Sequence, residues 1–325
     1  MAKSHELPFI SVVVLNWNRK KFVDPFMKSI TAQSYPKDRL EVLFTDNASD
    51  DGSVAYIKQK YGNLPYLKVI QNNKNYGYSK GNNLGIHQAN GDYVLVCNND
   101  LELKEDLLME LVAVAQEHNA AATVPKLVYI DPPGVINNAG SRLEPRNDWP
   151  IYEEGKDEKD KGQFNSVREI SAFCGACVLF SRQFLTKVGL FDPRFFMYFE
   201  DGDLSWRGQK AGYKYFYTPK AVAYHVHTGT STEGSPLFNY FVGRNRILIL
   251  TKNAGLAVIA KGWAKTLRDH LLLRIKRLFL SISNKYPRRL ALREFLASQK
   301  LIWGAIWMTP YALAKRLGII PEDHL

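Results

Sequence analysis

The chain has 325 residues, 46% of them hydrophobic, which is enough for a substantial core and excludes a disordered protein. The net charge of +11 is unevenly placed, because residues 252–325 carry 14 basic and 4 acidic side chains. Residues 1–251 carry 29 basic and 28 acidic side chains, a net charge of only +1. Any attraction to nucleic acid or to an anionic membrane must therefore come from the C-terminal quarter.

The cysteines and the N-terminus indicate the compartment. The chain has three cysteines, and the Cys174–Cys177 pair has no second pair that would complete a zinc site. We expect reduced thiols in a cytosolic compartment. The first six residues lead directly into a predicted strand, without an apolar leader or a cleavage site, so secretion is not expected.

The first third of the chain alternates between strands and helices, the pattern that builds a parallel sheet. Each predicted strand is followed by a loop rich in Asn, Asp and Gly. Because parallel strands end at one edge of a sheet, we expect these loops to lie together. The predicted strands are residues 9–15, 40–45, 67–71 and 93–97, and the helices between them pass through Ile30, 54–60 and Ile86.

The regular alternation is lost after a predicted helix at residues 107–116. Residues 132–134, Pro-Pro-Gly, indicate a turn, and the charged run 153–161 indicates a mobile surface loop. Strand-like order returns at residues 171–180. From about residue 237 the pattern is helical to the end of the chain.

An acidic residue follows the fourth predicted strand in the sequence Asn98-Asn99-Asp100. Ligands of open α/β sheets bind outside the carboxyl ends of the strands. A carboxylate there can hold a divalent metal and, through the metal, a diphosphate. The same three residues are also typical of an Asx turn that caps the next helix. The position after four strands favours the metal site.

Five motifs, in order along the chain, resemble those of glycosyltransferase family 2, and in particular its bacterial rhamnosyltransferase-like members. The resemblance covers roughly residues 8–251. It implies an α/β, Rossmann-like GT-A fold: a mostly parallel sheet with helices on both faces, followed here by a C-terminal helical extension. The motifs are residues 13–18 (Val-Val-Leu-Asn-Trp-Asn), 46–53, 75–77 with 82–85, 98–100 and 196–204.

The resemblance also implies an activity and a division of the chain. Residues 1–120 would form the nucleotide-sugar-binding half of the GT-A domain and residues 121–250 the acceptor-binding half. The implied reaction transfers a sugar from a nucleotide diphosphate with inversion at the anomeric carbon. We expect dTDP-rhamnose as donor, with UDP-galactofuranose, a UDP-hexose or a GDP-sugar as alternatives. The expected acceptor is a polyprenyl-diphosphate-linked glycan or a growing polysaccharide.

On the donor side, the resemblance implies that Asp46 accepts a hydrogen bond from N3–H of a uracil or thymine ring. Leu15, Asn16 and Trp17 would bound that base. A turn or N-cap role before the next helix is the alternative for Asp46. Three further residues are expected to close the donor pocket, unless they belong only to a polar connecting loop: Asn75, Gly77 and Asn83.

Asp100 is the expected ligand of Mg²⁺ or Mn²⁺, placed to neutralise charge on the diphosphate. The family often has Asp-x-Asp where this chain has Asn98, Asn99 and Asp100. We therefore expect fewer charged ligands around the metal. His225 is the second expected ligand, with His227 as runner-up, and neutral imidazole suits Mn²⁺ better than Mg²⁺. A purely structural histidine is the alternative.

An inverting transferase needs a general base that takes the proton of the acceptor hydroxyl. The resemblance assigns this role to Asp201, and it gives Glu200 the task of orienting the acceptor. A helix-capping role is the alternative for Asp201 and for Asp203. Arg244 would clamp the diphosphate, although an arginine at a helix start would look the same. Residues 171–177 resemble the small-residue segment that lines the acceptor side.

Residues 251–325 are predicted to form a basic, amphipathic, helical region that associates with membranes. Residues 256–280 place Leu, Ile and Trp at helical spacings among Lys and Arg, as in helices that lie in an anionic membrane interface. The Trp-rich run 301–310 is too short to span a bilayer. We expect peripheral attachment to the inner face of the cytoplasmic membrane. A packing or dimerisation domain is the alternative, and homo-oligomerisation stays open.

Two functions of other classes compete with sugar transfer. A nucleic-acid-binding protein would use the basic tail, but the tail interleaves its charges with Leu, Ile and Trp and contains no nucleic-acid motif. No nucleic-acid partner is therefore expected. An inactive scaffold would have no need to keep Asp46, Asp100 and Asp201 together.

Overall fold

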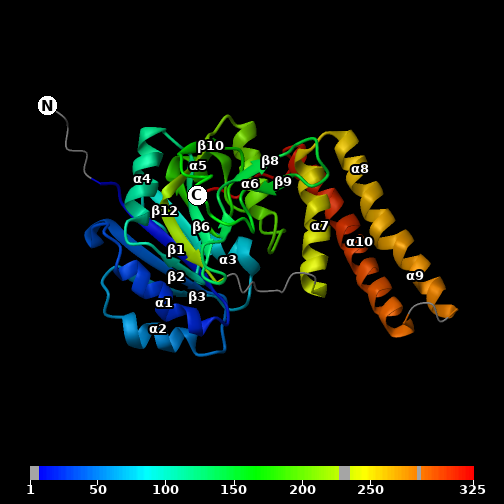
Figure 1. The fold of residues 1–325 in the computed structure, drawn as a ribbon, viewed down its shortest axis with the longest axis horizontal. Coiled ribbons are helices and arrows are strands. Elements are labelled where there is room, and N and C mark those ends of the chain that lie inside the picture. The colour runs from blue at the N-terminus through cyan, green and yellow to red at the C-terminus, as the bar shows by residue number, and fades with distance from the viewer. Residues whose placement is uncertain (1–6, 227–234, 284–286) are drawn as a thin grey trace.

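The computed structural model describes residues 7–226, 235–283 and 287–325. A ten-stranded sheet forms the centre of the first domain, and helices cover both of its faces (Figure 1). A group of long helices extends from one side of this domain. The α/β fold with a C-terminal helical extension is confirmed.

The N-terminal half of the sheet is parallel, as the alternation predicts. The strand β1 lies between β2 and β4, and β2 pairs with β3 on its other side. Helices cover both faces, so these strands are nearly continuous apolar runs. The elements are β1 (Ile10–Asn16), α1 (Lys20–Thr31), η1 (Lys37–Arg39), β2 (Leu40–Asp46), α2 (Ser53–Tyr61), β3 (Leu67–Gln71), α3 (Gly77–Ile86), β4 (Tyr93–Asn98), β5 (Leu101–Leu103) and α4 (Leu107–Glu117).

The second half adds antiparallel strands, so the whole sheet is mixed. β11 runs antiparallel between β4 and β6, and β12 runs parallel to β6 but antiparallel to β5 and β10. The parallel expectation thus holds for β1 to β4. The elements are β6 (Ala122–Tyr129), β7 (Ile136–Asn138), β8 (Ser141–Leu143), β9 (Ile151–Glu153), β10 (Arg168–Ile170), β11 (Cys177–Ser181), α5 (Arg182–Val188), α6 (Glu200–Lys210) and β12 (Tyr215–His225).

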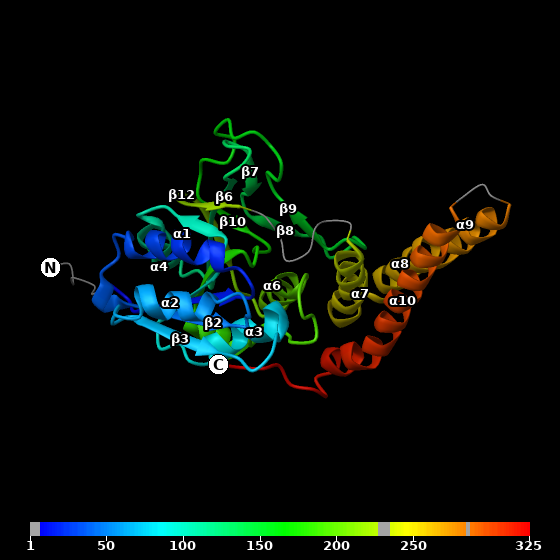
Figure 2. The same ribbon diagram turned by 90° about the horizontal axis from the view of Figure 1, so that it is seen from below.

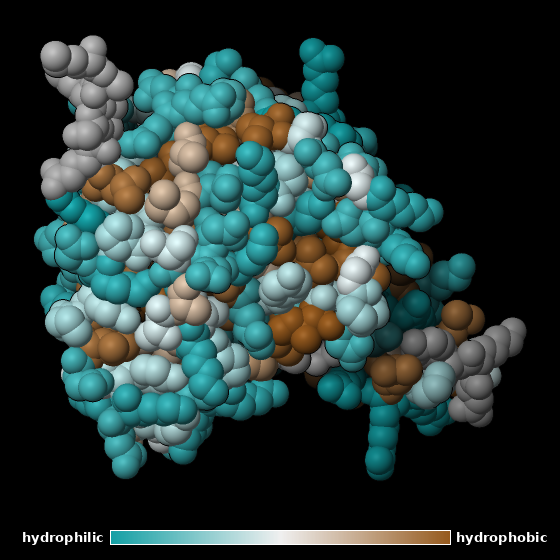
Figure 3. All heavy atoms as spheres, turned by 60° about the vertical axis from the view of Figure 1, so that its left-hand side comes forward, coloured by the Kyte–Doolittle hydropathy of each residue, from teal (hydrophilic) through white to brown (hydrophobic). Residues whose placement is uncertain are grey.

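Two hydrophobic clusters fill the two faces of the sheet, because alternate side chains of a strand point to opposite faces. Val12 joins the cluster that contains Phe26 of α1, and Val13 joins the cluster that contains Phe184 of α5. Cys97 and Cys177 lie opposite each other on β4 and β11 as buried free thiols. On the face turned to the viewer in Figure 3, hydrophilic side chains dominate and hydrophobic ones form separate patches.

The charged segment 153–161 is anchored to the sheet. Lys126 of β6 donates from Nζ to Asp160 Oδ2 at 2.8 Å, and the Tyr129 hydroxyl donates to Asp157 Oδ1 at 2.9 Å. The prediction of a mobile surface loop missed these partners, since nothing in a run of charges indicates that β6 carries the groups that bind it.

The C-terminal helices form an elongated unit (Figures 1 and 2). α7 packs against α6 and α10, and α8, η2 and α9 form a continuous helical path that α10 contacts on its return. In the part of the chain that the structure describes, no helix is long and apolar enough to cross a membrane. The elements are α7 (Pro236–Asn253), α8 (Leu256–Leu267), the π-helical turn η2 (Arg268–Leu272), α9 (Leu273–Ile282) and α10 (Arg288–Arg316).

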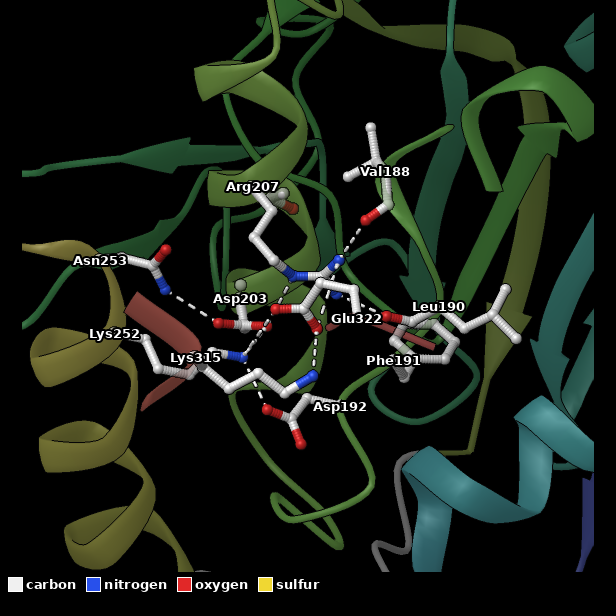
Figure 4. A network of polar contacts seen from close by, with 12 residues as sticks. Val188, Leu190, Phe191, Asp192, Asp203, Arg207, Lys252, Asn253, Lys315 and Glu322 are labelled. Carbon is white, nitrogen blue, oxygen red and sulfur yellow. Dashed lines mark hydrogen bonds and ion pairs between the residues drawn. The ribbon is translucent and has the colours of Figure 1, made fainter. Parts of the chain in front are cut away.

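A buried ion network joins the helical unit to the sheet domain (Figure 4). Lys252 of α7 donates from Nζ to Asp192 at 2.6 Å and to Asp203 at 2.9 Å. Arg207 donates from Nε to the same Asp203 carboxylate at 3.0 Å. Past α10 the chain returns to this domain, where Leu190 N donates to the Asp323 carbonyl at 2.6 Å (Figure 2). Asp203 is therefore an ion-pair partner, in addition to lying in the first turn of α6.

Candidate active site

The carboxyl ends of β1, β2 and β4 bring three of the predicted donor-side residues into one hydrogen-bonded chain. Asn16 stands opposite Asp46 in the parallel register. Asn99 Nδ2 donates to Asn16 Oδ1 at 2.6 Å, and Asn16 Nδ2 donates to Asp46 Oδ2 at 2.7 Å. The predicted meeting of strand-end residues therefore occurs in the structure, and side-chain amides connect the three strands.

Asp46 organises the loop that follows β2. Its side chain is 1% exposed, and it accepts hydrogen bonds from Ser49 N at 2.8 Å and from Ser49 Oγ at 2.7 Å. This geometry is the turn role that was the alternative for Asp46. Oδ1 accepts only the Ser49 N–H bond among the described residues, which leaves this oxygen with one lone pair for a ligand.

Two neighbours of Asn16 occupy different environments. Trp17 is 37% exposed at the end of β1, where its ring is available to a ligand. The Leu15 side chain packs under α3, where a Cβ on Gly81 would come within 2.8 Å of it. Leu15 therefore packs against α3 but is partly exposed, and Trp17 is the more exposed of the two.

Asp100 and His225 form the pair that was expected to hold a metal. β5 pairs with β12 so that Leu101 faces His225, which places Asp100 Oδ1 3.2 Å from His225 Nε2. Nδ1 of the same ring lies 2.9 Å from Asn137 Oδ1. Burial opposes ionisation of Asp100, but the bond from His225 and the charges of His225 and Arg19 outweigh burial and lower its pKa.

Asp100 and His225 offer two donor atoms of the kind that a divalent metal takes. A carboxylate oxygen and an imidazole nitrogen that face each other are donors that Mn²⁺ and Mg²⁺ accept. Among the described residues no group of three or more His, Cys, Asp and Glu side chains could hold a metal ion. The side chain of Asn99 is engaged with Asn16, and Asn98 donates its backbone N–H to the Ala176 carbonyl at 2.9 Å. His227, the runner-up ligand, lies outside the described residues.

The loop before α6 has an unusual backbone. Phe196, Tyr198 and Phe199 have φ values of 65°, 70° and 70°, in the left-handed region that bulky residues rarely adopt. Such residues persist only where their surroundings hold them, and they are frequent at functional sites. Glu200 and Asp201 follow directly as the first two residues of α6.

Arg244 and Asn245 of α7 hold this loop in place. Asn245 Nδ2 lies 2.9, 2.7 and 2.8 Å from the carbonyl oxygens of Phe195, Met197 and Tyr198. Arg244 Nη2 donates to the carbonyl oxygens of Arg194 and Phe195 at 2.6 and 2.9 Å. The role of Arg244 as a diphosphate clamp stays a prediction, and in this structure its buried guanidinium donates to backbone carbonyls and to Asn245.

The same loop contacts the donor side. The Phe196 carbonyl accepts hydrogen bonds from Tyr78 N at 2.6 Å and from Ser79 N at 3.2 Å, at the start of α3. Gly77 has φ +75°, and a Cβ there would come within 2.5 Å of the Phe196 ring. A glycine is therefore required at position 77 for the close approach of this backbone to Phe196.

Asn75 and Asn83 lie in different surroundings. Asn75 Oδ1 accepts hydrogen bonds from Gly77 N at 2.8 Å and from Asn47 Nδ2 at 3.2 Å, so it shapes the donor-side loop. Asn83 is buried and donates from Nδ2 to the Phe191 carbonyl at 2.7 Å. The expectation that Asn83 closes the donor pocket stays a prediction: its Nδ2 anchors the chain that leads to the loop before α6, and its Oδ1 has no hydrogen-bond partner among the described residues.

Asp201 has the environment of a general base. Gly175 N donates to Asp201 Oδ2 at 2.8 Å, and Gly202 N donates to Oδ1 at 2.7 Å. Burial raises the pKa of Asp201 even though these two N–H groups favour the carboxylate. A raised pKa strengthens the carboxylate as a proton acceptor. The predicted acceptor-side segment is thus in direct contact with the predicted base.

Glu200 is also buried, at 6% exposed, and its Oε2 has no hydrogen-bond partner among the described residues. Burial and the charge of Asp201 raise the pKa of Glu200 well above its ordinary value. A raised pKa favours the protonated carboxyl group, which is the form that can donate a hydrogen bond. The unpartnered oxygen is the kind of group that a bound hydroxyl would satisfy.

Sequence reasoning missed three residues that build this site. Ser49 and Asn245 hold the donor-side and acceptor-side loops, and the Tyr78 hydroxyl donates to the Gly175 carbonyl. Asn245 directly follows Arg244 in the sequence, so its position beside a predicted site residue could have suggested it. Ser49 lies inside the motif at residues 46–53 and Tyr78 directly follows the motif at residues 75–77, but their partners are known only from the fold.

The structure thus gathers polar side chains at the carboxyl ends of parallel strands, where ligands of open α/β sheets bind. Residues 11–189, more than half of the chain, match the family described as Glycosyl transferase family 2, and the chain belongs to this family. It is therefore a glycosyltransferase.

Individual relatives agree with this assignment. A Mycobacterium tuberculosis protein named N-acetylglucosaminyl-diphospho-decaprenol L-rhamnosyltransferase is 27% identical over 254 residues, which are 70% of this chain and 78% of the relative. Staphylococcus aureus TarS 1-349 in complex with UDP-GlcNAc has a TM-score of 0.57 at 17% identity, covering 95% of this chain and 92% of that one. The Pyrobaculum calidifontis mannosyltransferase PcManGT, in complex with GDP-Man and Mn²⁺, has a TM-score of 0.54 at 15% identity, with 94% and 88% covered. These two structures share the fold of this chain.

Proposed function

We propose that this protein is an inverting rhamnosyltransferase that transfers the sugar of dTDP-rhamnose to a polyprenyl-diphosphate-linked glycan or a growing cell-surface polysaccharide. The observation that carries the proposal is the partly buried Asp201 carboxylate, held by two backbone N–H groups beside the small-residue segment. The M. tuberculosis relative, named for L-rhamnose transfer to a diphospho-decaprenol-linked sugar, matches most of both chains and supports the donor and the acceptor.

The proposed reaction is a single displacement. Asp201 takes the proton of an acceptor hydroxyl as the hydroxyl oxygen attacks the anomeric carbon from the side opposite the nucleotide diphosphate. The bond from the anomeric carbon to the diphosphate oxygen breaks, and the configuration inverts. Glu200, whose buried Oε2 has no hydrogen-bond partner among the described residues, would hydrogen-bond to the acceptor and orient it.

Asp100 and His225 would hold the divalent cation, Mg²⁺ or Mn²⁺. When bound there, the cation would stabilise the negative charge that develops on the departing diphosphate. Asn98 and the donor itself would complete the ligand set with water. The Mn²⁺ in the PcManGT complex supports a divalent metal on this fold.

The nucleotide base would lie at the ends of β1 and β2. Trp17 offers an exposed ring there, and the remaining lone pair of Asp46 Oδ1 would accept N3–H of the base. Uracil and thymine both carry this N–H group, so a UDP-hexose or UDP-galactofuranose is the second candidate donor. The GDP-Man bound to PcManGT keeps a GDP-sugar as a third.

We place the helical region on the inner face of the cytoplasmic membrane, as a peripheral attachment. Its large apolar side chains are exposed among cations, with Trp303 and Trp307 66% and 82% exposed. An anionic bilayer surface satisfies both kinds of group. The exposed apolar residues of this region include Leu256, Leu272, Leu273, Phe279, Ile282, Leu292, Leu296 and Leu317.

A donor screen tests the proposal. Thermal unfolding would be followed with dTDP-rhamnose, UDP-galactofuranose, UDP-glucose and GDP-mannose, each with and without Mn²⁺ or Mg²⁺. We expect the largest rise in Tm with dTDP-rhamnose and metal, and we expect the metal-dependent part of that rise to disappear in Asp100→Ala. If no nucleotide sugar changes the Tm, the proposal is overturned.

A further inference from the structure

A buried carboxylate between the GT-A domain and the helical region is surrounded by more positive charge than it neutralises. Asp148, which is 5% exposed, lies 2.9 Å from Arg246 Nη1, 3.0 Å from Lys265 Nζ and 3.5 Å from Lys261 Nζ. Burial opposes ionisation of Asp148, but these three cations lower its pKa. One negative charge therefore faces three positive ones, contributed by α7 and α8.

An open cavity of about 490 Å³ adjoins this cluster, between the loop after β8 and helix α8. Arg146 and Lys261 line it, together with Glu144, Pro145 and Asn147. Arg146 has no carboxylate partner within the described part of the chain, and the Lys261 side chain is 63% exposed. The Glu144 carboxylate is bonded to Arg142 and Asn147, at 3.1 Å in each case. The cavity thus presents two cations: Arg146, and Lys261, which is largely exposed although its Nζ also lies 3.5 Å from Asp148 Oδ1.

The loop that lines this cavity also reaches the catalytic residues. The Trp149 ring packs edge-on against Phe199 at 5.5 Å, and Phe199 directly precedes Glu200. Ile151, at the end of the same loop, lies where a Cβ on Gly202 would meet it at 2.8 Å. The same loop therefore lines the cavity beside α8 and contacts the start of α6, where the proposed general base lies. α8 is the second helix of the C-terminal helical unit and belongs to the proposed membrane-attachment region.

We propose that this cavity binds the diphosphate of a lipid-linked acceptor, through Arg146 and Lys261 at the rim and the excess charge of Lys265 and Arg246 behind them. This inference rests on the proposed function, since it names the part of the acceptor that the site recognises. A diphosphate carries several negative charges, and cations bind it by charge-assisted hydrogen bonds. The position beside α8 would let the prenyl chain enter the membrane while the sugar reaches Asp201.

Direct binding is the first test. Calorimetry would compare geranyl diphosphate, geraniol and inorganic pyrophosphate on the full chain, without membranes and with EDTA, so that no metal assists binding at Asp100 and His225. We expect geranyl diphosphate to bind more tightly than inorganic pyrophosphate, and geraniol not to bind. Arg146→Ala combined with Lys261→Ala should weaken geranyl diphosphate binding by about tenfold or more. Both side chains are exposed, so the variant is expected to fold.

The matched control removes two exposed charges elsewhere in the helical region, by Arg289→Ala combined with Lys300→Ala on α10. This control should weaken binding to anionic vesicles but leave geranyl diphosphate binding unchanged. An equal loss in the two double variants would overturn the proposal, because general electrostatics would then explain it. Equal binding of geranyl diphosphate and inorganic pyrophosphate would overturn the assignment to a lipid-linked diphosphate.

A kinetic arm separates this inference from the proposed function. If the unchanged enzyme transfers sugar, the Arg146→Ala, Lys261→Ala variant should raise KM for a diphosphate-linked acceptor by about tenfold, with little change in kcat. An unchanged KM would overturn the proposed subsite and leave the transferase assignment intact. If no donor supports transfer, the proposed function fails, and the binding experiment still decides whether the cavity holds a prenyl diphosphate.

Discussion

The donor side and the acceptor side of the site are held in place by different means. On the donor side, the register of three parallel strands brings Asn16, Asp46 and Asn99 together, and their amides complete the arrangement. On the acceptor side, Asp201 follows a loop of left-handed residues that depends on Asn245 of a distant helix. The donor side is thus a property of the sheet, whereas the acceptor side is a property of the contact between the sheet domain and α7.

The largest effect should come from the acceptor side. Replacement Asp201→Asn keeps the size of the side chain but removes the proton acceptor, so we expect kcat to fall by about a thousandfold or more. Donor binding should be unchanged, because the donor-side residues lie on other elements. Steady-state rates and calorimetric titration with donor would measure the two quantities. Near-normal turnover would remove Asp201 from the role of base.

The second effect tests whether the loop before α6 is what makes Asp201 effective. Asn245→Ala leaves the carbonyls of Phe195, Met197 and Tyr198 without this donor, at a cost of about 1–3 kcal/mol for each buried group that stays unpaired. A displaced base should lower kcat by about a hundredfold. Stopped assays over a pH series would also show a shift of the acidic limb, because that limb reports the pKa of Asp201.

The control for this variant is Arg316→Ala. Arg316 of α10 donates from Nη1 to the carbonyls of Thr251 and Ala254 at 3.2 and 2.5 Å, at the end of α7, and within the described part of the chain it makes no hydrogen bond or ion pair with the loop before α6. It should lower the Tm without moving the pH profile. If the profile of Asn245→Ala coincides with that of the control, Asn245 is a stability residue and the comparison between the two sides loses its basis.

The difference between the donor side and the acceptor side also explains which parts of the structure the sequence predicts. The alternation of apolar runs and polar loops predicts β1 to β4, and the resemblance adds the strand-end residues, because position along a parallel strand fixes position at the sheet edge. The contacts that Arg244 and Asn83 make could not be predicted in this way. Their partners are backbone carbonyls of residues 191–195, and a carbonyl has the same chemistry at every position of a sequence.

The third effect concerns pH and stability. Burial and the charge of Asp201 raise the pKa of Glu200 in the folded protein above the unfolded value of about 4.3. The folded state therefore holds this proton more tightly, and the free energy of unfolding falls as pH rises from about 4.3 through the folded pKa. Glutamine has no such proton, so Glu200→Gln should lose less stability over that interval. Urea unfolding at pH 5 and pH 8 measures the difference, and parallel losses in both proteins would contradict it.

The smallest effect should come from the donor side, where several hydrogen bonds together hold the loop after β2. Ser49→Ala removes one hydroxyl that donates to Asp46 and accepts from Asn16 Nδ2 and Asn18 N, while Ser49 N still reaches Asp46. We expect KM for the donor to rise by about threefold to tenfold, in line with about 1 kcal/mol for one hydrogen bond, with kcat nearly unchanged. Ser29→Ala, which loses only a hydroxyl bond to the Phe26 carbonyl within α1, should leave KM unaltered. A fall in kcat in Ser49→Ala would show that a change at the strand ends also alters catalysis by Asp201. The donor side and the acceptor side would then not be independent.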